Sequence, residues 1–316
     1  MKILIITQHF WPEQFTINEV AKILSKENKI DVIYCNGTLA KFFGAILGWV
    51  YKIQVVWHVR NYQQNFILYN LINFFSKFSC ISKIICVSKS TMSQFKNKSK
   101  CIVINNGVDT NEFNPTCVDK KLRKEFNIDN NKIIIGTAGR VVPRKNFKHF
   151  ISIGIEVCKK FKKDCLFVLV GDTPYYFDQS LMHELKQLVK DSDLEDKFIF
   201  TGYAERVESY ISDFDIFFIP SKYEDPFPRV VIEAMSLGKP VLGYNIGGIG
   251  EAIDNKINGF SFNLKDKGVV DYLLELIEDE ELRLKMSYEA RKKAVNNYDS
   301  RIIATKIIDN LKLLFS

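Results

Sequence analysis

Residues 132–147 read KIIIGTAGRVVPRKNF. After Lys132 the next six are apolar or small, and such a short run predicts a buried strand at 132–138. Gly139 and a loop with cations at 140, 144 and 145 come next, and a helix is expected over 146–162. A strand that opens through a loop into a helix is the repeating unit of parallel α/β sheets, whose ligands bind beyond the carboxyl ends of the strands.

The same alternation extends along the chain in both directions. Strands are expected at 2–7, 31–35, 53–58, 83–87 and 101–105, and then at 165–171, 197–202, 215–220 and 240–244. Helices are expected at 16–27, 38–50, 64–80, 89–96, 179–192, 205–212 and 229–237, and throughout 268–315. Apolar strands alternating with helices predict an α/β protein with parallel sheets that are covered by helices.

Residues 106–118, NGVDTNEFNPTCV, interrupt this alternation with Gly, Pro and Asn and carry no apolar period. Such a stretch is typical of a linker between domains. The 316 residues are also long enough for about two domains. We therefore expect two doubly wound domains, at residues 1–112 and 113–316.

The composition excludes several classes of protein. With 47% hydrophobic and 26% charged residues, the chain is neither disordered nor fibrous. Its seven cysteines are odd in number and form no CxxC pair, which disfavours a disulfide scaffold and a cysteine-based zinc site. We expect reduced cysteines, no metal and a cytoplasmic location. The run at 42–51, FFGAILGWVY, is too short to span a membrane, which takes about twenty residues.

The net charge of +7 is unevenly distributed. Residues 1–115 contain 13 Lys or Arg against 6 Asp or Glu, whereas the remaining residues balance at 31 and 31. The excess indicates an anionic partner, such as nucleic acid, a membrane surface or a phosphorylated substrate; a solvated basic surface is the alternative. Because no basic and aromatic stripe or known nucleic-acid module is present, nucleic acid is disfavoured.

The residues after the predicted strands suggest binding of an anionic ligand. Arg140 and Lys145 lie between a strand end and a helix start, where phosphate binds, although a solvated basic loop has the same composition. Gly247 and Gly248 form a second turn into a short helix. Neither a P-loop nor a GxGxxG fingerprint is present, so a dehydrogenase is disfavoured.

Taken together and in order, these segments resemble glycosyltransferase family 4, the retaining GT-B enzymes that use nucleotide sugars. Gly139-Arg140 with Lys145 is similar to the GR-x4-K motif of that family, and Val170-Gly171-Asp172 to its VGDGP turn. The stretch from Asp225 to Glu233 is similar to the E-x7-E donor signature, and 247–251, GGIGE, to the loop that follows it.

The resemblance implies a GT-B-like fold, with two Rossmann-like domains facing across a cleft and a C-terminal helix crossing back to the first domain. It implies a retaining transferase for surface polysaccharide, with a UDP- or GDP-sugar donor as co-substrate, no other cofactor, and a glycan or polyprenyl-diphosphate-linked acceptor. The implied catalytic residues are Asp225, His58, Arg140 and Lys145. The implied donor-binding residues are Gly139, Arg140, Lys145, Gly171, Asp172, Asp225, Phe227, Pro228, Arg229, Glu233, Gly247, Gly248 and Ile249.

The first domain shows further similarities to the family. The segments WPE at 11–13 and INE at 17–19 resemble the opening of bacterial surface-polysaccharide transferases, and NGVD at 106–109 with Phe113 resembles the end of their first domain. His58 follows a predicted strand where the family often has an active-site histidine. A peripheral contact with an anionic membrane fits the charge and the apolar run at 42–51. An ordinary core helix is the favoured alternative for that run.

Two departures from the family pattern bear on activity. Asp225 replaces the first glutamate of the signature, and Pro228 replaces a glycine and so removes a backbone N–H. Only three residues separate Glu27 from Asp31, where the family has a further strand, a long loop and a helix. The first domain also lacks a Gly-rich first loop. A degenerate GT-B subunit that binds nucleotide sugar without transferring it is therefore the second hypothesis, and sugar-nucleotide epimerisation or phosphorolysis is a third.

Overall fold

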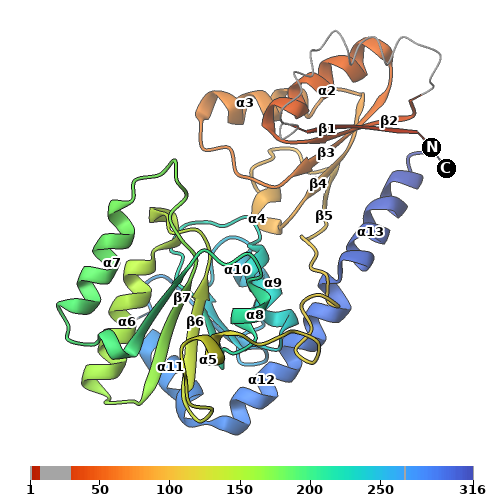
Figure 1. Cartoon of the computed structure of the whole chain (residues 1–316). Coiled ribbons are helices and arrows are strands. Elements are labelled where there is room, and N and C mark those ends of the chain that lie inside the picture. The colour runs from red at the N-terminus through yellow and green to blue at the C-terminus, as the bar shows by residue number, and fades with distance from the viewer. Residues whose placement is uncertain (1, 8–29, 267, 316) are drawn as a thin grey trace. The chain divides into compact units, whose positions relative to one another are not determined.

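The computed structural model describes residues 2–7, 30–266 and 268–315 (Figure 1). The expected helix at 16–27 and the motifs at 11–13 and 17–19 lie outside these residues. The chain divides into unit 1, formed by Met1–Asn105 with Lys306–Ser316, and unit 2, formed by Asn106–Thr305. Each unit contains a parallel sheet, which confirms the α/β fold class.

Unit 1 carries five described strands in the order β1-β2-β3-β4-β5. They are β1 (Ile3–Thr7), β2 (Val32–Asn36), β3 (Gln54–Val59), β4 (Ile81–Cys86) and β5 (Cys101–Val103). The described helices between them are α2 (Thr38–Tyr51), α3 (Phe66–Phe75) and α4 (Lys89–Met92). Val55, Trp57 and Val59 alternate along β3 toward the core under α2 and α3.

The described strands of unit 1 lie side by side in chain order, without the reversal of strand order that defines a doubly wound sheet. Right-handed crossovers in a sequential order place every connecting helix on the same face. The described helices agree, since Phe42 of α2 packs on Phe75 of α3 with ring centroids 5.5 Å apart. The short connection between Glu27 and Asp31 accounts for this difference from the expected double winding, because it leaves too few residues for another strand and helix.

Unit 2 carries six strands in the order β11-β10-β9-β6-β7-β8. They are β6 (Ile133–Ala138), β7 (Cys165–Val170), β8 (Phe198–Gly202), β9 (Ile216–Ile219), β10 (Val241–Tyr244) and β11 (Gly259–Phe262). The helices are α5 (Leu122–Glu125), α6 (Phe147–Lys160), α7 (Ser180–Lys190), α8 (Glu208–Ile211), α9 (Arg229–Ser236), α10 (Ile249–Ala252), α11 (Val269–Glu278), α12 (Glu280–Lys293) and α13 (Ser300–Lys312). Strand β11 and helix α5 were not expected from the sequence.

The strand order of unit 2 reverses between β6 and β9, which are neighbours although β7 and β8 come between them in the chain. The chain proceeds from β6 toward one edge of the sheet and from β9 toward the other. The two loops beyond the carboxyl ends of these strands therefore diverge, and the crevice between them is where open α/β sheets bind ligands. This is the double winding expected for the second domain.

The predicted linker at 106–118 belongs to unit 2. Asn106 Nδ2 donates to the Phe227 carbonyl at 2.7 Å, Val108 N donates to the Tyr298 carbonyl at 2.9 Å, and the Thr110 hydroxyl donates to Asp299. These bonds place the division at Asn105/Asn106 rather than at 112/113.

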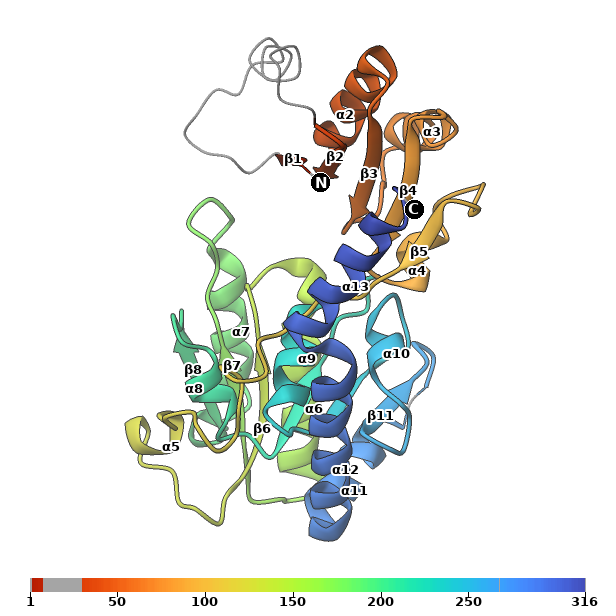
Figure 2. The same ribbon diagram turned by 90° about the vertical axis from the view of Figure 1, so that its right-hand side faces the viewer.

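The C-terminal residues are helical almost throughout, as expected, in α11, in α12 with a π-helical turn at Ala294–Tyr298, and in α13 (Figure 2). Asp279 interrupts the run and caps α12, since its carboxylate accepts from Leu282 N at 2.8 Å. Asp299 interrupts it again before α13 and accepts from Arg301 N at 2.9 Å. From Lys306 onward α13 belongs to unit 1, where Gln54 Nε2 donates to the Leu314 carbonyl at 3.4 Å. The expected return of the chain to the first domain is therefore confirmed.

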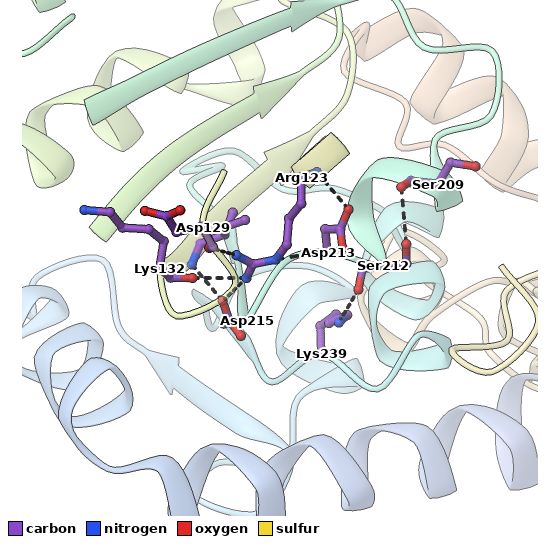
Figure 3. Close-up of polar contacts among 9 residues, drawn as sticks. Arg123, Asp129, Lys132, Ser209, Ser212, Asp213, Asp215 and Lys239 are labelled. Carbon is purple, nitrogen blue, oxygen red and sulfur yellow. Dashed lines mark hydrogen bonds and ion pairs between the residues drawn. The ribbon is translucent and has the colours of Figure 1, made fainter. Parts of the chain in front are cut away.

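A polar network ties α5 to the amino ends of β6 and β9 (Figure 3). Asp215, just before β9, accepts from Ile134 N at 2.8 Å and from the Arg123 guanidinium at 3.2 Å. Arg123 N also donates to Asp213 at 3.1 Å. Nearby, partly buried Lys239 donates to the Ser212 carbonyl at 2.8 Å, and desolvation of its ammonium lowers the pKa to about 8. Because this network lies at the edge of the sheet opposite the carboxyl ends, we interpret it as structural.

Candidate active site

Unit 2 gathers thirteen of the fourteen predicted site residues in loops beyond strand ends and in the helices that follow. Gly139 and Arg140 follow β6, Lys145 ends a 3₁₀ turn (Pro143–Lys145), and Gly171 and Asp172 follow β7; Asp225, Phe227 and Pro228 lie between β9 and α9, Arg229 and Glu233 lie in α9, Gly247 and Gly248 follow β10, and Ile249 starts α10. Parallel strands end at one edge of the sheet, so these loops lie on the same side of it.

The loops after β6 and β7 touch through their glycines. Both residues have a φ in the left-handed region, +146° at Gly139 and +137° at Gly171. A Cβ on Gly171 would lie only 2.0 Å from the Gly139 carbonyl oxygen, a distance that real Cβ atoms do not reach. Gly139 N also donates to the Val170 carbonyl at 2.9 Å. Glycine at 171 therefore lets the loop that carries Arg140 lie directly against the end of β7.

A cation and an acid from different loops pair at the site. Lys145 Nζ lies 2.8 Å from the Asp225 carboxylate, and both side chains are largely buried. Arg140 is exposed and makes no hydrogen bond or ion pair with any residue in the described ranges. Of these two cations, Lys145 is thus neutralised internally, whereas Arg140 is available to an anion.

The Gly247-Gly248 turn packs against the backbone of the Asp225 loop. A Cβ on Gly247 would lie 2.4 Å from the Asp225 carbonyl oxygen, and one on Gly248 would lie 2.1 Å from that of Pro226. Gly248 N donates to the Asp225 carbonyl at 2.8 Å, and Ile249 N to the Ile246 carbonyl at 3.1 Å. The expected anion cradle is therefore reduced. Of the three amides at 247–249, only that of Gly247 makes no hydrogen bond with the described part of the chain.

Helix α9 carries a buried carboxylate, that of Glu233. Pro228 precedes the helix, which begins at Arg229. Glu233, one turn further, is buried, and its carboxylate lies 3.2 Å from the Arg229 guanidinium. Burial raises the pKa of this carboxyl, although Arg229 opposes the shift. A buried carboxylate with one cation partner retains acceptor capacity for ligand hydroxyls.

Three predicted donor contacts have another role in the structure. Phe227 is only 2% exposed, and its ring packs on Tyr298 with centroids 5.4 Å apart, so its side chain anchors the loop in the core. Ile249 is fully buried beside Gly243. Asp172 Oδ1 accepts from Thr173 N at 2.7 Å, the local turn contact that a loop aspartate commonly makes.

Two hydroxyl groups near the strand ends were not assigned from the sequence. Ser221, directly beyond Pro220 at the end of β9, and Thr173, in the loop after β7, have buried hydroxyl oxygens without a hydrogen-bond partner in the structure. Buried polar groups are nearly always paired. The place of each residue just beyond a buried strand was the available signal, and both are candidates for a ligand contact.

A histidine lies beneath the loops of unit 2. His149 Nε2 and the Tyr244 hydroxyl are 2.5 Å apart, and Lys222 Nζ lies 5.6 Å from the centre of the Tyr244 ring. Burial first, and Lys222 second, lowers the pKa of His149 to about 4. A neutral imidazole therefore supports Tyr244, at the end of β10, just before the glycine turn.

His58, the remaining predicted residue, lies in unit 1 near the carboxyl end of β3. Its Nδ1 is 2.8 Å from the Tyr34 hydroxyl, and its Nε2 is buried and has no hydrogen-bond partner among the described residues. Burial, with Arg60 and Lys41, lowers the pKa of His58 to about 4. The imidazole is therefore neutral at physiological pH, and its Nε2 remains available to a ligand.

The described residues contain neither a metal-binding cluster nor a membrane-spanning helix. No group of three or more His, Cys, Asp or Glu in residues 2–7, 30–266 and 268–315 is arranged to hold a metal ion. Within the same ranges every helix is too short or too polar to cross a bilayer.

Comparison with known proteins places the chain in a family. Residues 118–293, more than half of the chain, match the family described as glycosyl transferases group 1. A UDP-Gal:alpha-D-GlcNAc-diphosphoundecaprenol alpha-1,3-galactosyltransferase of Escherichia coli is 25% identical over 311 residues, which cover 93% of this chain and 77% of that protein. An N,N'-diacetylbacillosaminyl-diphospho-undecaprenol alpha-1,3-N-acetylgalactosaminyltransferase of Campylobacter jejuni is 28% identical over 218 residues, 67% of this chain and 54% of that protein.

Solved structures agree with the fold. Alr3699/HepE of Anabaena, in a crystal structure with UDP, superposes with a TM-score of 0.82 over 93% of this chain and 81% of that chain, at 24% identity. Sucrose-phosphate synthase of Thermosynechococcus elongatus gives 0.79 over 97% and 80%, at 18% identity. The matched residues 118–293 include all thirteen site residues of unit 2. The chain therefore belongs to the glycosyl transferases group 1 family, has the GT-B fold and is a glycosyltransferase.

Proposed function

We propose that the protein transfers a sugar from a nucleoside diphosphate sugar to a glycan or polyprenyl-diphosphate-linked acceptor, with retention at the anomeric carbon. The bond from the anomeric carbon to the diphosphate breaks, and the diphosphate leaves with the electron pair. A bond to the acceptor hydroxyl oxygen forms on the same face of the sugar, and the hydroxyl proton passes to the leaving diphosphate. The observation that carries the proposal is the pair of cations at the strand order reversal, with Arg140 unpaired and Lys145 held by Asp225. A UDP-sugar is favoured, because the Anabaena structure contains UDP and the name of the E. coli relative specifies UDP-Gal.

The main role of this site is to stabilise the negative charge of the leaving diphosphate. Arg140, Lys145 and the Gly247 amide are the donors that we assign to it. Donors aimed at developing negative charge lower the barrier because they need no reorganisation during the reaction. Removing one such donor typically slows an enzyme by about two to three orders of magnitude.

The acids recognise the rest of the donor. Glu233 accepts hydrogen bonds from the ribose hydroxyls, and its burial makes these bonds strong. Asp225 orients the hydroxyls of the transferred sugar, and its ion pair with Lys145 holds the carboxylate in place. The hydroxyl of Ser221 is a further contact that we assign to the donor.

His58 serves the acceptor side in this proposal. With Nδ1 accepting from the Tyr34 hydroxyl, the neutral imidazole carries its proton on Nε2. That N–H is then a donor to the sugar or to the incoming acceptor. The low pKa excludes a role for His58 as a cationic acid near neutral pH.

The acceptor suggests where the protein acts. The E. coli and C. jejuni relatives are named for acceptors linked through a diphosphate to undecaprenol, a membrane lipid. By analogy, we propose that this protein works in surface polysaccharide synthesis at the cytoplasmic face of a membrane, as a peripheral protein. It needs no cofactor in this scheme beyond the donor itself.

Calorimetric titration with UDP, GDP and ADP tests the donor site. We expect one nucleotide to bind with micromolar affinity and Glu233→Ala to lose that binding. Glu224→Ala, which removes an exposed acid nearby, serves as the control and should bind normally. No binding of any nucleotide by the folded wild type would contradict the proposal.

A transfer assay tests catalysis separately. Arg140→Ala combined with Lys145→Ala should abolish transfer of radiolabelled sugar and leave the circular dichroism spectrum unchanged. Lys159→Ala, at an exposed position on α6, is the control for loss of positive charge. Wild-type turnover by the double variant would contradict the assignment.

A non-catalytic subunit that binds nucleotide sugar is the second candidate. It is favoured by unit 1, whose described strands lack the reversal that creates a binding crevice in doubly wound sheets. Nucleotide binding that depends on Glu233, without transfer to any lipid-linked acceptor, would support this candidate over the first.

A further inference from the structure

Helix α2 packs two glycines closely on the sheet and leaves several large apolar side chains exposed. A Cβ on Gly44 would lie 2.1 Å from Cys35 Sγ, and a Cβ on Gly48 would lie 2.2 Å from Val55 Cγ2. These two glycines, one turn apart, let the helix approach the sheet closely. On the opposite side of the helix Leu39 and Val50 are each 56% exposed, and Trp49, on an adjoining side, is 65% exposed. A helix that only covers a core would show the reverse arrangement.

Helix α3 adds to the same surface. It lies beside α2, with Phe42 packed on Phe75 (Figure 1). Six residues of the two helices, Leu39, Trp49, Val50, Phe66, Ile67 and Phe74, have exposed fractions from 56% to 78%, and we call them the apolar face. Neither helix has an acid in its first turn or a basic residue in its last. An exposed apolar cluster of this kind on a folded domain marks an interaction site.

Positive charge surrounds the apolar face. The stretch 32–108 contains no Asp or Glu and nine Lys or Arg. Lys52 caps α2 and is exposed, and Lys77 follows α3 and is also exposed. Lys96 Nζ lies 5.9 Å from the ring centre of Tyr69 on α3, and Lys100 donates to the Phe78 carbonyl just beyond that helix at 2.7 Å. No carboxylate of this stretch is present to offset these charges.

We propose that the apolar face of α2 and α3 docks on the surface of an anionic membrane. Aromatic and aliphatic side chains enter the boundary between headgroups and acyl chains, while the surrounding lysines contact lipid phosphates. A second copy of the chain is a poorer partner, because two such cationic faces repel each other. Nucleic acid is also poorer, because the exposed side chains of the face itself are uncharged.

The docking surface deepens the proposed function, since it brings the enzyme to a membrane-borne acceptor. Its biological role rests on the proposed function, but its binding to membranes does not. Vesicle binding is measured without donor or acceptor. A protein that binds vesicles but transfers no sugar would contradict the proposed function and leave the docking surface intact. A protein that transfers sugar but does not bind vesicles would contradict the docking surface and leave the proposed function intact.

Co-sedimentation of the full chain with vesicles is the first test. We compare vesicles of phosphatidylcholine alone with vesicles that also contain phosphatidylglycerol, each at about 0.05 M and about 0.5 M salt. Binding should require the anionic lipid and should weaken at high salt. Trp49 fluorescence should shift to the blue on binding, and the shift should be lost in Trp49→Phe, which keeps an apolar side chain.

Matched variants separate the apolar and charged contributions. Trp49→Ser with Phe66→Ser and Phe74→Ser should weaken the partition coefficient by more than about tenfold. Leu284→Ser with Tyr288→Ser removes two equally exposed side chains from α12 and should have no effect.

Lysine variants test the charge. Each of Lys52→Gln and Lys77→Gln should weaken the partition coefficient by about fivefold. Lys159→Gln and Lys285→Gln, at exposed positions of unit 2, are the controls.

Three outcomes would overturn the proposal. The first is wild-type protein that does not bind anionic vesicles at low salt. The second is a triple serine variant that binds as well as the wild type. The third is self-association in the absence of lipid, seen by analytical ultracentrifugation and abolished by the triple variant, which would assign the face to a second copy of the chain.

Discussion

Lys145 Nζ lies 2.8 Å from the Asp225 carboxylate, although the two residues are 80 positions apart. The sequence assigns them to different motifs, one for phosphate and one for the sugar. In the structure each is the partner of the other. A donor diphosphate must therefore compete with Asp225 for this cation, whereas Arg140 is free to meet it at once.

Asp225→Asn should separate donor binding from catalysis. The amide no longer neutralises Lys145, so we expect UDP to bind at least as tightly as to the wild type. Transfer should fall by about a hundredfold, because the group that orients the sugar has lost its charge. Calorimetry with UDP and initial rates measure the two effects, with Glu224→Gln as the control. A parallel loss of both UDP binding and transfer would show that Asp225 supports the loop rather than the reaction.

Gly171→Ala and Gly139→Ala should differ in their effect on stability. Both glycines have a left-handed φ, which costs an alanine about 1–2 kcal/mol. A Cβ at 139 makes only an ordinary van der Waals contact, with Phe147 Cζ at 3.9 Å, whereas one at 171 collides with the Gly139 carbonyl oxygen. We expect unfolding free energy to fall by about 1–2 kcal/mol for Gly139→Ala and by more than about 4 kcal/mol for Gly171→Ala.

Urea denaturation followed by circular dichroism compares these two variants. The decisive result is whether Gly171→Ala loses more unfolding free energy than Gly139→Ala. Equal losses would mean that the loops after β6 and β7 separate easily, and the phosphate site could not then depend on their contact.

The positions of the site residues could be predicted from the sequence, but the directions of their side chains could not. Gly139, Gly171, Asp225 and Gly247 were placed because each follows an apolar run, and parallel strands end at a common edge. A motif carries no record of packing, so it does not show that the Phe227 ring fills the core beside Tyr298.

The orientation of α2 and the existence of β11 were missed for physical reasons too. Helix α2 is apolar on nearly every side, so its periodicity does not show which face is buried. Gly44 and Gly48, spaced by four, were the available signal. Strand β11 covers only Gly259–Phe262 and directly follows the buried Asn258, a pattern that is typical of a turn.

The low pKa of His58 should make unit 1 less stable in acid. The folded pKa is about 4 against about 6.5 in an unfolded chain, so below pH 6.5 the unfolded state binds more protons. Stability is therefore full above pH 6.5 and declines as the pH falls toward 4. Between pH 7 and pH 5 the loss from this residue is about 2 kcal/mol.

Tryptophan fluorescence during urea denaturation measures this loss, since all three tryptophans, at 11, 49 and 57, fall in unit 1. His58→Gln should show a flatter dependence on pH than the wild type. His183→Gln removes an exposed histidine of unit 2 and should leave the dependence unchanged. The same slope in His58→Gln and wild type would mean that His58 is protonated in the folded state.

Phe227 variants should change stability without changing the donor site. The ring is 2% exposed and packs on Tyr298, so Phe227→Ala leaves a cavity that costs about 3–5 kcal/mol. Phe227→Leu keeps most of the volume and should cost less than about 1.5 kcal/mol. Tyr223→Ala, which removes an exposed aromatic side chain of the same loop, is the control for stability.

UDP affinity should be unchanged in Phe227→Leu, because the side chain supports the loop from below while Asp225 and the Gly247 amide lie on its ligand side. Loss of UDP binding in a Phe227→Leu protein of normal stability would instead place the ring against the donor, as the sequence motif first suggested.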